Sequence, residues 1–263
     1  FTNAFCKYFS PEKKVILFIG PGNNGGDGLA VARLLACKNY KCIVYFLIIT
    51  DKLSHDAEIN LIKLKKIKNI QVEWIKKISD FPAIPNNSVI IDALFGSGLS
   101  RPLSGITAKL VEYINKNKKT IVSIDVPSGL SGEDNTKNLP QHIIQADYTF
   151  TFQFPKISFF FSENNLFTGN WEVLPIGLHP EIIEKINTPY SLIDKQQIFS
   201  LIKKRNKFSH KGDFGHALLI AGSYGKNGAA VLASHACLRS GVGLLTTHIP
   251  KSGYNILQCT VPE

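Results

Sequence analysis

The amino-acid sequence alternates apolar runs rich in β-branched residues with amphipathic segments of about ten residues. Strands that alternate with helices of this length form a parallel sheet with helices on both faces. The sequence therefore predicts a doubly wound, mostly parallel α/β domain with a Rossmann-like sheet. The expected strands are 15–19, 42–49, 72–75, 89–94, 120–125, 148–153 and 171–175, and the expected helices are 28–37, 56–66 and 107–115.

A second and shorter alternation follows, with a strand expected at 216–220, a helix at 229–239 and a strand at 244–249. A single βαβ unit cannot bury both faces of its sheet, so this second α/β domain is expected to be truncated. The residues between the two alternations are polar and of mixed charge, which is typical of a linker. We therefore predict domains at 1–178 and 207–263, joined by a linker at 179–206.

Composition excludes several classes of protein. The chain has 263 residues, of which 44% are hydrophobic and 19% charged, as in an ordinary globular protein rather than a disordered or disulfide-scaffold chain. The longest apolar run, 42–49, is far shorter than the roughly 20 residues of a membrane-spanning helix. Five cysteines without a CxxC pair indicate free thiols in a reducing compartment, which predicts a cytoplasmic location.

The net charge of +10 rests on lysine, because only four of the 30 basic residues are arginines. The lysines are spread along the chain, and a solvated surface explains them better than a nucleic-acid interface. We expect neither a nucleic-acid partner nor a membrane partner, although a positive field would attract a phosphorylated metabolite. The densest lysine group is Lys63, Lys65, Lys66, Lys68, Lys76 and Lys77.

A glycine-rich segment, GPGNNGGDG at 20–28, lies between the first expected strand and the first expected helix. It contains the GxGxxG pattern of dinucleotide-binding folds. Because Gly and Asn tolerate positive φ, residues 23–26 are predicted to form a tight loop with its backbone N–H groups pointing one way. Asp27 would lie at the helix start, where its carboxylate repels phosphate. The loop is therefore expected to meet ribose hydroxyls, a neutral ring or a cation, with a purely structural glycine turn as the alternative.

Asp92 lies toward the carboxyl end of the fourth expected strand and opens a second segment, DALFGSGLSRP at 92–102. Open α/β sheets bind their ligands at the carboxyl ends of strands. The loop offers donors that suit phosphate oxygens: the backbone and side chains of Gly96, Ser97, Gly98, Ser100 and Arg101. Alternatively, Asp92 caps a turn and Arg101 lies in solvent.

A third segment, DVPSG at 125–129, begins at the end of the next expected strand. Asp92 and Asp125 would then converge on one edge of the sheet, either as acid–base groups or as ligands of a hard cation. Asn24, Asp92 and Ser128 offer only oxygen donors, which suit a monovalent or hard cation better than zinc.

Three segments of this chain resemble a known family. GPGNNGGDGLAVARLL, IIDALFGSGLSRPLSG and SIDVPSGLSGE closely resemble the YjeF N-terminal domain, the NAD(P)H-hydrate epimerase. HKGDFGHALLIAGSYGKNGAAVLASHACLRSGVGLLTT resembles the start of an ADP-dependent NAD(P)H-hydrate dehydratase domain, which has a ribokinase-like fold. The order of the two parts is that of the bifunctional hydrate-repair enzymes.

The resemblance implies a substrate, NADH or NADPH hydrated at C6 of the nicotinamide ring, with the choice between NADHX and NADPHX left open. It implies a potassium ion held by Asn24, Asp92 and Ser128, ADP as the cofactor of the complete dehydratase domain, and a homo-oligomer. It also implies substrate-binding residues, which are Asn23, Asn24, Gly25, Gly26, Asp27, Gly96, Ser97, Gly98, Leu99, Ser100, Arg101, Pro102 and Asp125, and Ala229 in the second domain.

The chain departs from the family pattern at both ends. The family normally begins with a further helix, and the dehydratase continues with a Gly-Asp motif that carries its catalytic carboxylate. The sequence contains neither that helix nor that motif, and it starts with Phe1 and contains no Met. We therefore expect pieces to be missing at both ends. We also expect no dehydration of the hydrate by these 263 residues. We hypothesise that Asp125 catalyses epimerisation. The alternatives are a hydride-transferring dehydrogenase, a non-catalytic binding module and a ribokinase-like kinase.

Overall fold

We describe a computed structural model of the chain over residues 1–67, 70–202 and 204–262. Lys68 of the lysine group, Lys203 of the predicted linker and Glu263 lie outside the described residues. The chain divides into two compact units, Phe1–Asn187 (unit 1) and Thr188–Glu263 (unit 2). This division falls inside the segment predicted as a linker, and the domain limits drawn from the sequence stay a prediction.

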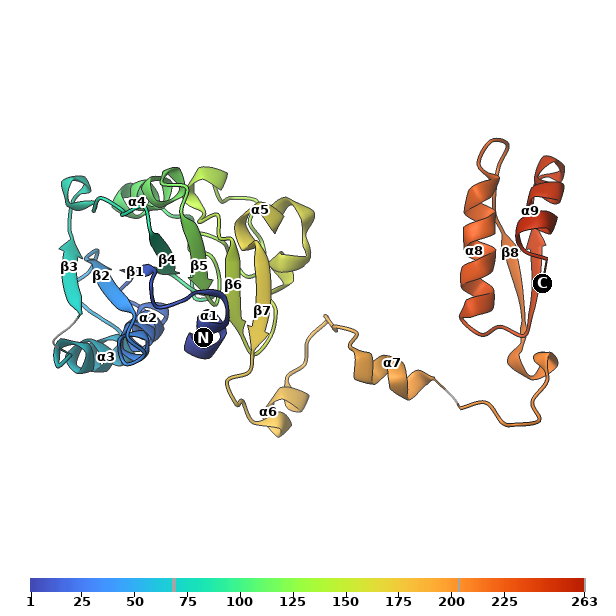
Figure 1. Cartoon of the computed structure of the whole chain (residues 1–263), viewed down its shortest axis with the longest axis horizontal. Coiled ribbons are helices and arrows are strands. Elements are labelled where there is room, and N and C mark those ends of the chain that lie inside the picture. Colours follow the sequence, from blue (N-terminus) through green and yellow to red (C-terminus); the bar gives the residue numbers. More distant parts are fainter. Residues whose placement is uncertain (68–69, 203, 263) are drawn as a thin grey trace. The chain divides into compact units, whose positions relative to one another are not determined.

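Unit 1 is built on a seven-stranded sheet in which every neighbouring pair of strands is parallel (Figure 1). The strand order is β3-β2-β1-β4-β5-β6-β7, so the chain runs outward in one direction from β1 and in the other from β4. This confirms the predicted doubly wound parallel sheet. The strands are β1 (Lys14–Ile19), β2 (Lys41–Leu47), β3 (Gln71–Ile75), β4 (Ser88–Ala93), β5 (Thr120–Ile124), β6 (Tyr148–Phe152) and β7 (Asn170–Leu174).

Helices cover both faces of this sheet. Side chains of α2 and α3 pack in one hydrophobic cluster, and side chains of α4 pack in another. Short 3-10 turns lie in the connections, at Ile78–Asp80, Pro140–His142, Ile157–Phe160 and Ser162–Asn164. The helices of unit 1 are α1 (Thr2–Tyr8), α2 (Asn23–Ala36), α3 (His55–Lys65), α4 (Gly105–Lys116), α5 (Asn165–Thr168) and α6 (Pro180–Lys185).

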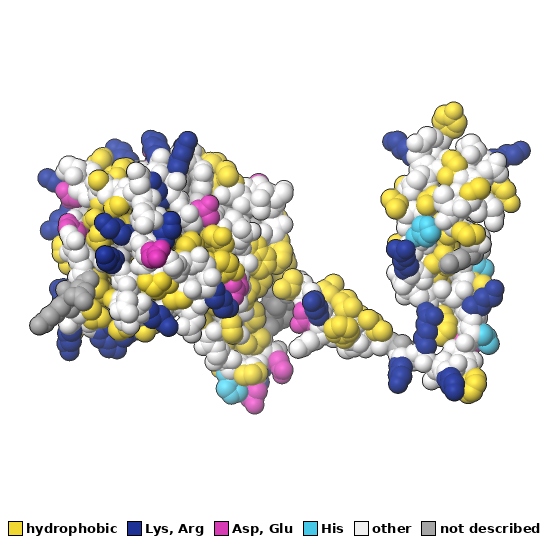
Figure 2. Space-filling view, in the orientation of Figure 1, with side chains coloured by type: hydrophobic (Ala, Val, Ile, Leu, Met, Phe, Trp, Pro, Cys, Tyr) yellow, Lys and Arg dark blue, Asp and Glu magenta, His cyan; other side chains and the backbone are white. Residues whose placement is uncertain are grey.

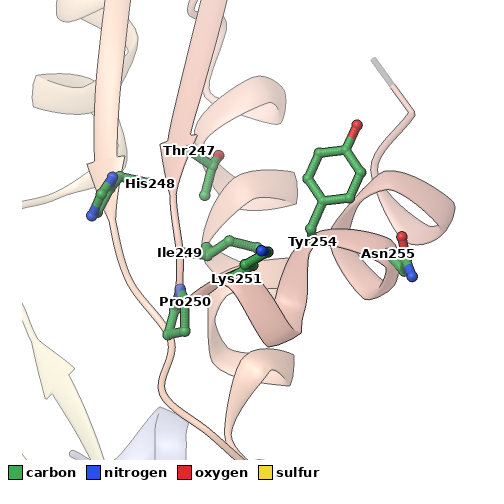
Figure 3. A pocket seen from close by; sticks show the side chains of 7 residues that line it. All are labelled: Thr247, His248, Ile249, Pro250, Lys251, Tyr254 and Asn255. Carbon is green, nitrogen blue, oxygen red and sulfur yellow. The ribbon is translucent and has the colours of Figure 1, made fainter.

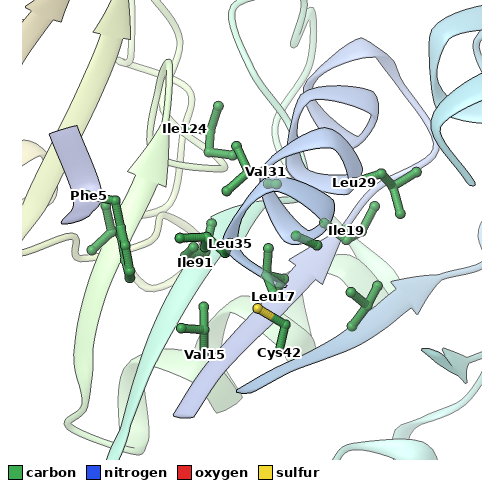
Figure 4. Close-up of a cluster of buried hydrophobic side chains, with 14 of the residues drawn as sticks. Phe5, Val15, Leu17, Ile19, Leu29, Val31, Leu35, Cys42, Ile91 and Ile124 are labelled. Atoms are coloured by element: carbon green, nitrogen blue, oxygen red, sulfur yellow. The ribbon is translucent and has the colours of Figure 1, made fainter. Parts of the chain in front are cut away.

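The central strand β1 shows why its sequence is an unbroken apolar run. Val15, Leu17 and Ile19 pack with α2 in one cluster, whereas Ile16 and Phe18 pack with α4 in the other. A strand covered on both faces needs apolar side chains at every position. Figure 4 shows the first cluster, with α2 lying over the strands.

Helix α1 was not expected from the sequence. Phe5 is fully buried, and the ring centroids of Phe1 and Phe150 lie 5.3 Å apart. The rings of Phe5 and Phe9 lie 4.7 Å apart. The i, i+4 spacing of Phe1, Phe5 and Phe9 was the signal for a helix with one apolar face.

Unit 2 contains the βαβ arrangement expected from its sequence. β8 (His216–Ile220) and β9 (Leu244–His248) pair in parallel, with α8 (Asn227–Arg239) between them in the chain. Leu218 and Ile220 are 65% and 72% exposed, so this small sheet leaves apolar side chains uncovered. The remaining elements are α7 (Lys195–Leu201), α9 (Tyr254–Thr260) and 3-10 turns at Lys211–Phe214 and Lys251–Gly253.

Two surface features bear on partners. Lys and Arg side chains are scattered among uncharged ones on the face that Figure 2 shows. Over residues 1–67, 70–202 and 204–262, no helix is both long and apolar enough to cross a membrane.

Candidate functional site

The candidate site lies at the carboxyl edge of the unit 1 sheet. The chain order reverses between β1 and β4, and such switch points open a crevice for ligands in doubly wound sheets. The three sequence motifs follow β1, β4 and β5, which are neighbours in the sheet. The topology therefore brings residues 20–27, 92–102 and 125–129 to the same edge.

The NNGGD segment forms the first turns of α2, which begins at Asn23 and not at the predicted residue 28. No glycine from 20 to 28 has a positive φ, so the predicted positive-φ loop is wrong. Two of these glycines, Gly20 and Gly25, are required by close backbone approach instead. A Cβ on Gly20 would lie 1.8 Å from the carbonyl oxygen of Leu94, and one on Gly25 would lie 1.9 Å from that of Gly20. Asp27 consequently lies in the second turn of α2 rather than at the helix start.

Replacing Gly25 with Ala is expected to lower the free energy of unfolding by about 3 kcal/mol, because the new methyl group would overlap backbone that cannot move cheaply. Gly98→Ala is the matched control, since no atom lies within 4 Å of a Cβ at that position. Its expected effect is below about 0.5 kcal/mol. Urea unfolding of the two variants checks this, and equal stability would contradict the close-approach explanation.

Asn24 joins the first motif to the second. Its side-chain amide donates a hydrogen bond of 2.9 Å to the carbonyl oxygen of Phe95. A Cβ on Gly96 would lie 3.0 Å from Asn24 Cγ, so glycine at 96 lets the two segments meet. Asn24, Gly25 and Gly26 are buried, whereas Asn23 is exposed.

The GSGLSRP loop presents most of its side chains to solvent. Ser97, Ser100 and Arg101 are exposed, as are Gly98 and Pro102. Leu99 packs instead against the α4 cluster and anchors the loop. The loop is therefore a solvated turn whose hydrogen-bond donors are accessible to a phosphate.

Asp92 lies at the end of β4 and is fully buried. Its Oδ2 accepts hydrogen bonds from the Ser123 hydroxyl at 2.9 Å and from the backbone N–H of Ser128 at 2.8 Å. Its Oδ1 accepts from the Ser128 hydroxyl at 2.5 Å and from the backbone N–H of Leu94 at 3.3 Å. Burial raises the pKa of the Asp92 carboxyl, and these four hydrogen bonds act in the opposite direction.

The residues around Asp92 fit a monovalent cation. The Ser128 hydroxyl lies 3.1 Å from the carbonyl oxygen of Phe95, which also accepts from Asn24. The predicted ligands Asn24, Asp92 and Ser128 are thus gathered around one more oxygen, that of Phe95. Among the described residues no cationic side chain pairs with Asp92, and a buried carboxylate without a counter-charge favours a bound cation. A cluster of His, Cys, Asp and Glu suited to a transition metal is absent from the described part of the chain.

Asp125 lies at the centre of a tight turn directly after β5. Its φ is +63°, and the backbone N–H of Val126 donates to the carbonyl oxygen of Ile124 at 2.8 Å, which defines a γ-turn. Its Oδ1 accepts hydrogen bonds from the Thr151 hydroxyl at 3.2 Å and the Phe152 N–H at 3.1 Å. No described residue forms a hydrogen bond with Oδ2, which leaves this oxygen available to a ligand.

Lys156 is a residue of this site that the sequence analysis missed. Its ammonium nitrogen lies 2.9 Å from Asp125 Oδ1, and both side chains are largely buried. Lys156 follows β6, the next strand in the sheet after β5. A lysine shortly after a strand was visible in the sequence, but its contact with Asp125 depends on β5 and β6 being neighbours.

Asp27 is an exposed residue of α2 whose carboxyl, partly shielded from solvent, faces the same region. Desolvation of its carboxyl, and then repulsion from Asp125 and Asp56, raise the Asp27 pKa to about 6. A carboxyl group with this pKa exchanges protons near neutral pH, which suits general acid–base chemistry.

Replacing Asp27 with Asn is expected to stabilise the protein at pH 8 by about 1 kcal/mol after solvent screening is allowed for. The folded-state pKa of Asp27 lies above its ordinary value of 3.8, so ionisation disfavours the folded state. The penalty is complete above pH 6 and disappears as the pH falls toward 4. The gain from Asp27→Asn should therefore be smaller at pH 5 than at pH 8 in chemical denaturation.

Asp134 provides the control for this experiment, because hydrogen bonds from Thr136 lower the pKa of its carboxyl. Asp134→Asn should give no gain in stability at pH 8. An Asp27→Asn protein that is no more stable than the parent at pH 8 would contradict the assignment.

Unit 2 holds Ala229, the remaining predicted contact residue. Ala229 is exposed in the first turn of α8. A pocket of about 520 Å³ lies at the carboxyl end of β9 (Figure 3), and Ala229 is not among its lining residues. The pocket is lined by Thr247, His248, Ile249, Pro250, Lys251, Tyr254 and Asn255.

Comparison with known families and proteins gives consistent matches. The family model described as YjeF-related protein N-terminus matches residues 1–158. The NAD(P)H-hydrate epimerase of Oenococcus oeni is 34% identical over 167 residues, which are 64% of this chain and 76% of that protein. A solved structure of a yeast protein, ynu0 (YNL200c), has a TM-score of 0.59 at 24% identity and covers 74% of this chain and 84% of its own.

Longer relatives match nearly the whole chain. The bifunctional NAD(P)H-hydrate repair enzyme Nnr of Dictyoglomus turgidum is 31% identical over 253 residues, 96% of this chain and 48% of that enzyme. The enzyme of the same name from Moorella thermoacetica is 32% identical over 256 residues, again 96% and 48%. The chain therefore spans about half the length of these bifunctional relatives.

Proposed function

The chain belongs to the family of YjeF-related protein N-termini, and on that premise we propose that unit 1 is an NAD(P)H-hydrate epimerase. The substrate is NADH or NADPH hydrated at C6 of the nicotinamide ring, and the reaction interconverts its R and S forms. One observation of the site carries the proposal: Asp125, directly after β5 at the carboxyl edge of the sheet, has one oxygen held by three protein donors, and no described residue forms a hydrogen bond with its other oxygen.

The hydrate is a hemiaminal, and its chemistry sets what the site must do. The lone pair of the ring nitrogen forms a C=N bond while the C6–O bond breaks, and the departing hydroxyl takes up a proton to leave as water. Water then adds to the iminium from either face and returns a proton. The reaction therefore needs a proton donor near C6 and a negative charge beside the cationic ring.

Two carboxyl groups support a division of these roles. Asp27, with its pKa raised to about 6, suits the proton donor and acceptor. Asp125 presents its free Oδ2 beside the ring, where it stabilises the cation and shares in proton transfer. Segments 23–27 and 96–102 bind the dinucleotide in this proposal, with Arg101 available for its phosphates.

We assign potassium to Asn24, Asp92, Ser128 and the carbonyl oxygen of Phe95. When bound there, the ion supplies a positive charge that balances the buried Asp92. The side chains of Asn24 and Ser128 fix the relative positions of the loops after β1, β4 and β5 through the Phe95 carbonyl and Asp92.

The second part of the chain extends the proposal to the complete protein. Residues 207–263 are taken as the start of a ribokinase-like domain that dehydrates the S hydrate with ADP, and Ala229 as a residue that touches the hydrate. The matches along 96% of this chain to bifunctional repair enzymes support this. A cytoplasmic homo-oligomer stays a prediction.

An epimerase assay tests the central proposal. The R hydrate of NADH is supplied together with a separate S-specific, ADP-dependent dehydratase, and recovery of NADH is followed by its absorbance with and without this chain and potassium. Faster recovery is expected with the chain. No acceleration by a folded protein that still binds the dinucleotide would favour a non-catalytic binding module.

A further inference from the structure

We propose that Lys156 is a positioning residue of the epimerase site, which clamps Asp125 through Oδ1 so that Oδ2 faces the reacting carbon. The inference rests on the proposed function and adds to it a residue that none of the sequence motifs contains. It starts from an unusual feature of the backbone at two neighbouring strand ends.

Strands β5 and β6 both end in a γ-turn around a residue other than glycine. Asp125 has a φ of +63° after β5, and Gln153 has a φ of +60° after β6. The second turn is closed by the Phe154 N–H, which donates to the carbonyl oxygen of Phe152 at 2.7 Å. Such conformations are costly for residues with a side chain, and they persist where the surroundings hold them.

The Lys156 ammonium joins the two turns. It lies 2.9 Å from Asp125 Oδ1, and it donates to the carbonyl oxygens of Phe152 and Phe154 at 3.3 and 3.2 Å. Phe152 and Phe154 flank Gln153, so the lysine spans the second turn while it pairs with the residue at the centre of the first. Its three protons are thereby matched with three protein acceptors.

This arrangement fixes the orientation of the Asp125 carboxylate. The ammonium, the Thr151 hydroxyl and the Phe152 N–H all converge on Oδ1. A carboxylate held by three donors on one oxygen cannot rotate freely, and its other oxygen points in one direction. Fixed orientation of a reacting group accelerates the chemical step rather than substrate binding.

The charges around Asp125 give the lysine a second consequence. Asp27 faces Asp125 from α2 with a like charge, and Lys156 faces it from the loop after β6 with the opposite charge. Without the ammonium, Asp125 would keep the repulsion from Asp27 and lose the cation that pairs with it. The ion pair with Lys156 therefore offsets the like charge of Asp27 beside Asp125.

The test compares Lys156→Met with Lys156→Arg and with Lys38→Met, which removes one charge at an exposed position after α2. Steady-state epimerisation is measured for each protein. For Lys156→Met we expect kcat to fall about 30-fold or more with KM changed less than about 3-fold. Lys156→Arg should recover part of kcat, and Lys38→Met should match the parent.

The outcomes separate this inference from the proposed function. An inactive parent protein would overturn the epimerase assignment and the inference with it. An active parent with an unchanged kcat in Lys156→Met would overturn the role of Lys156 alone. A loss confined to KM would also overturn it, because it would make the lysine a ligand of the substrate. If Lys156→Met fails to fold, Lys156→Arg decides the question, since a role in folding alone predicts an unchanged kcat once the variant folds, whereas a positioning role predicts a kcat below that of the parent.

Discussion

Replacing Asp125 with Asn is expected to slow the interconversion of R and S hydrates by about 10²–10⁴-fold, the range by which a positioned proton-transfer group accelerates such a step. Asparagine retains an oxygen for the donors that converge on Oδ1 and replaces the free Oδ2 with an amide nitrogen. The substitution therefore removes the acidic group and the charge that pairs with Lys156, and it keeps an acceptor for the Thr151 hydroxyl and the Phe152 N–H.

The choice of asparagine also protects the backbone. Residue 125 has a φ of +63°, and Asn tolerates this region better than other residues with a side chain except Asp. The melting temperature of Asp125→Asn is nevertheless expected to fall, because the Lys156 ammonium loses its counter-charge, so activities are compared at a temperature at which both proteins are folded. Asp134→Asn, at an exposed carboxyl outside the site, is the matched control and should retain full activity. Near-normal interconversion by Asp125→Asn would remove Asp125 from its proposed role.

Replacing Asp92 with Asn is expected to lower the free energy of unfolding by about 3 kcal/mol and to abolish stabilisation by potassium. Four donors converge on the two oxygens of Asp92, and an amide presents its NH₂ group to two of them. The variant would also remove the only carboxylate from the assigned ligand set.

The measurement is thermal unfolding in potassium and in choline salts at equal ionic strength. The parent protein should melt at a higher temperature in potassium, and Asp92→Asn should show no such difference. Ser123→Ala is the control, because it removes one hydrogen bond of Asp92 and leaves the assigned ligands in place. It should cost about 1 kcal/mol and retain the response to potassium. A potassium response that survives in Asp92→Asn would exclude Asp92 as a ligand.

Most of the fold of unit 1 followed from local patterns in the sequence. A strand such as β1 can be predicted from its apolar run, because a strand buried on both faces needs apolar residues at each position. The positions of Asp92 and Asp125 at strand ends could be predicted for the same reason, since each directly follows an apolar run. The helix α1 was missed, although the spacing of Phe1, Phe5 and Phe9 carried the signal.

The glycine-rich segment shows where local reasoning failed. Glycine is used either for positive φ or for close approach of backbone, and the sequence does not distinguish the two uses. Gly20 and Gly25 meet the carbonyl oxygens of Leu94 and Gly20, and one of these contacts joins residues more than seventy positions apart. That contact exists only once β1 and β4 are neighbours.

The sequence by itself determined the strands, the parallel architecture and the three motifs, because periodicity and turn chemistry act over a few neighbouring residues. Tertiary structure alone decided which charges meet. Asp92 gathers its donors from β5 and from the segments after β4 and β5, and Asp125 meets Lys156 across β5 and β6. Coulomb and hydrogen-bond energies depend on distances of a few ångströms. The order of strands in the sheet sets those distances, and spacing along the chain does not.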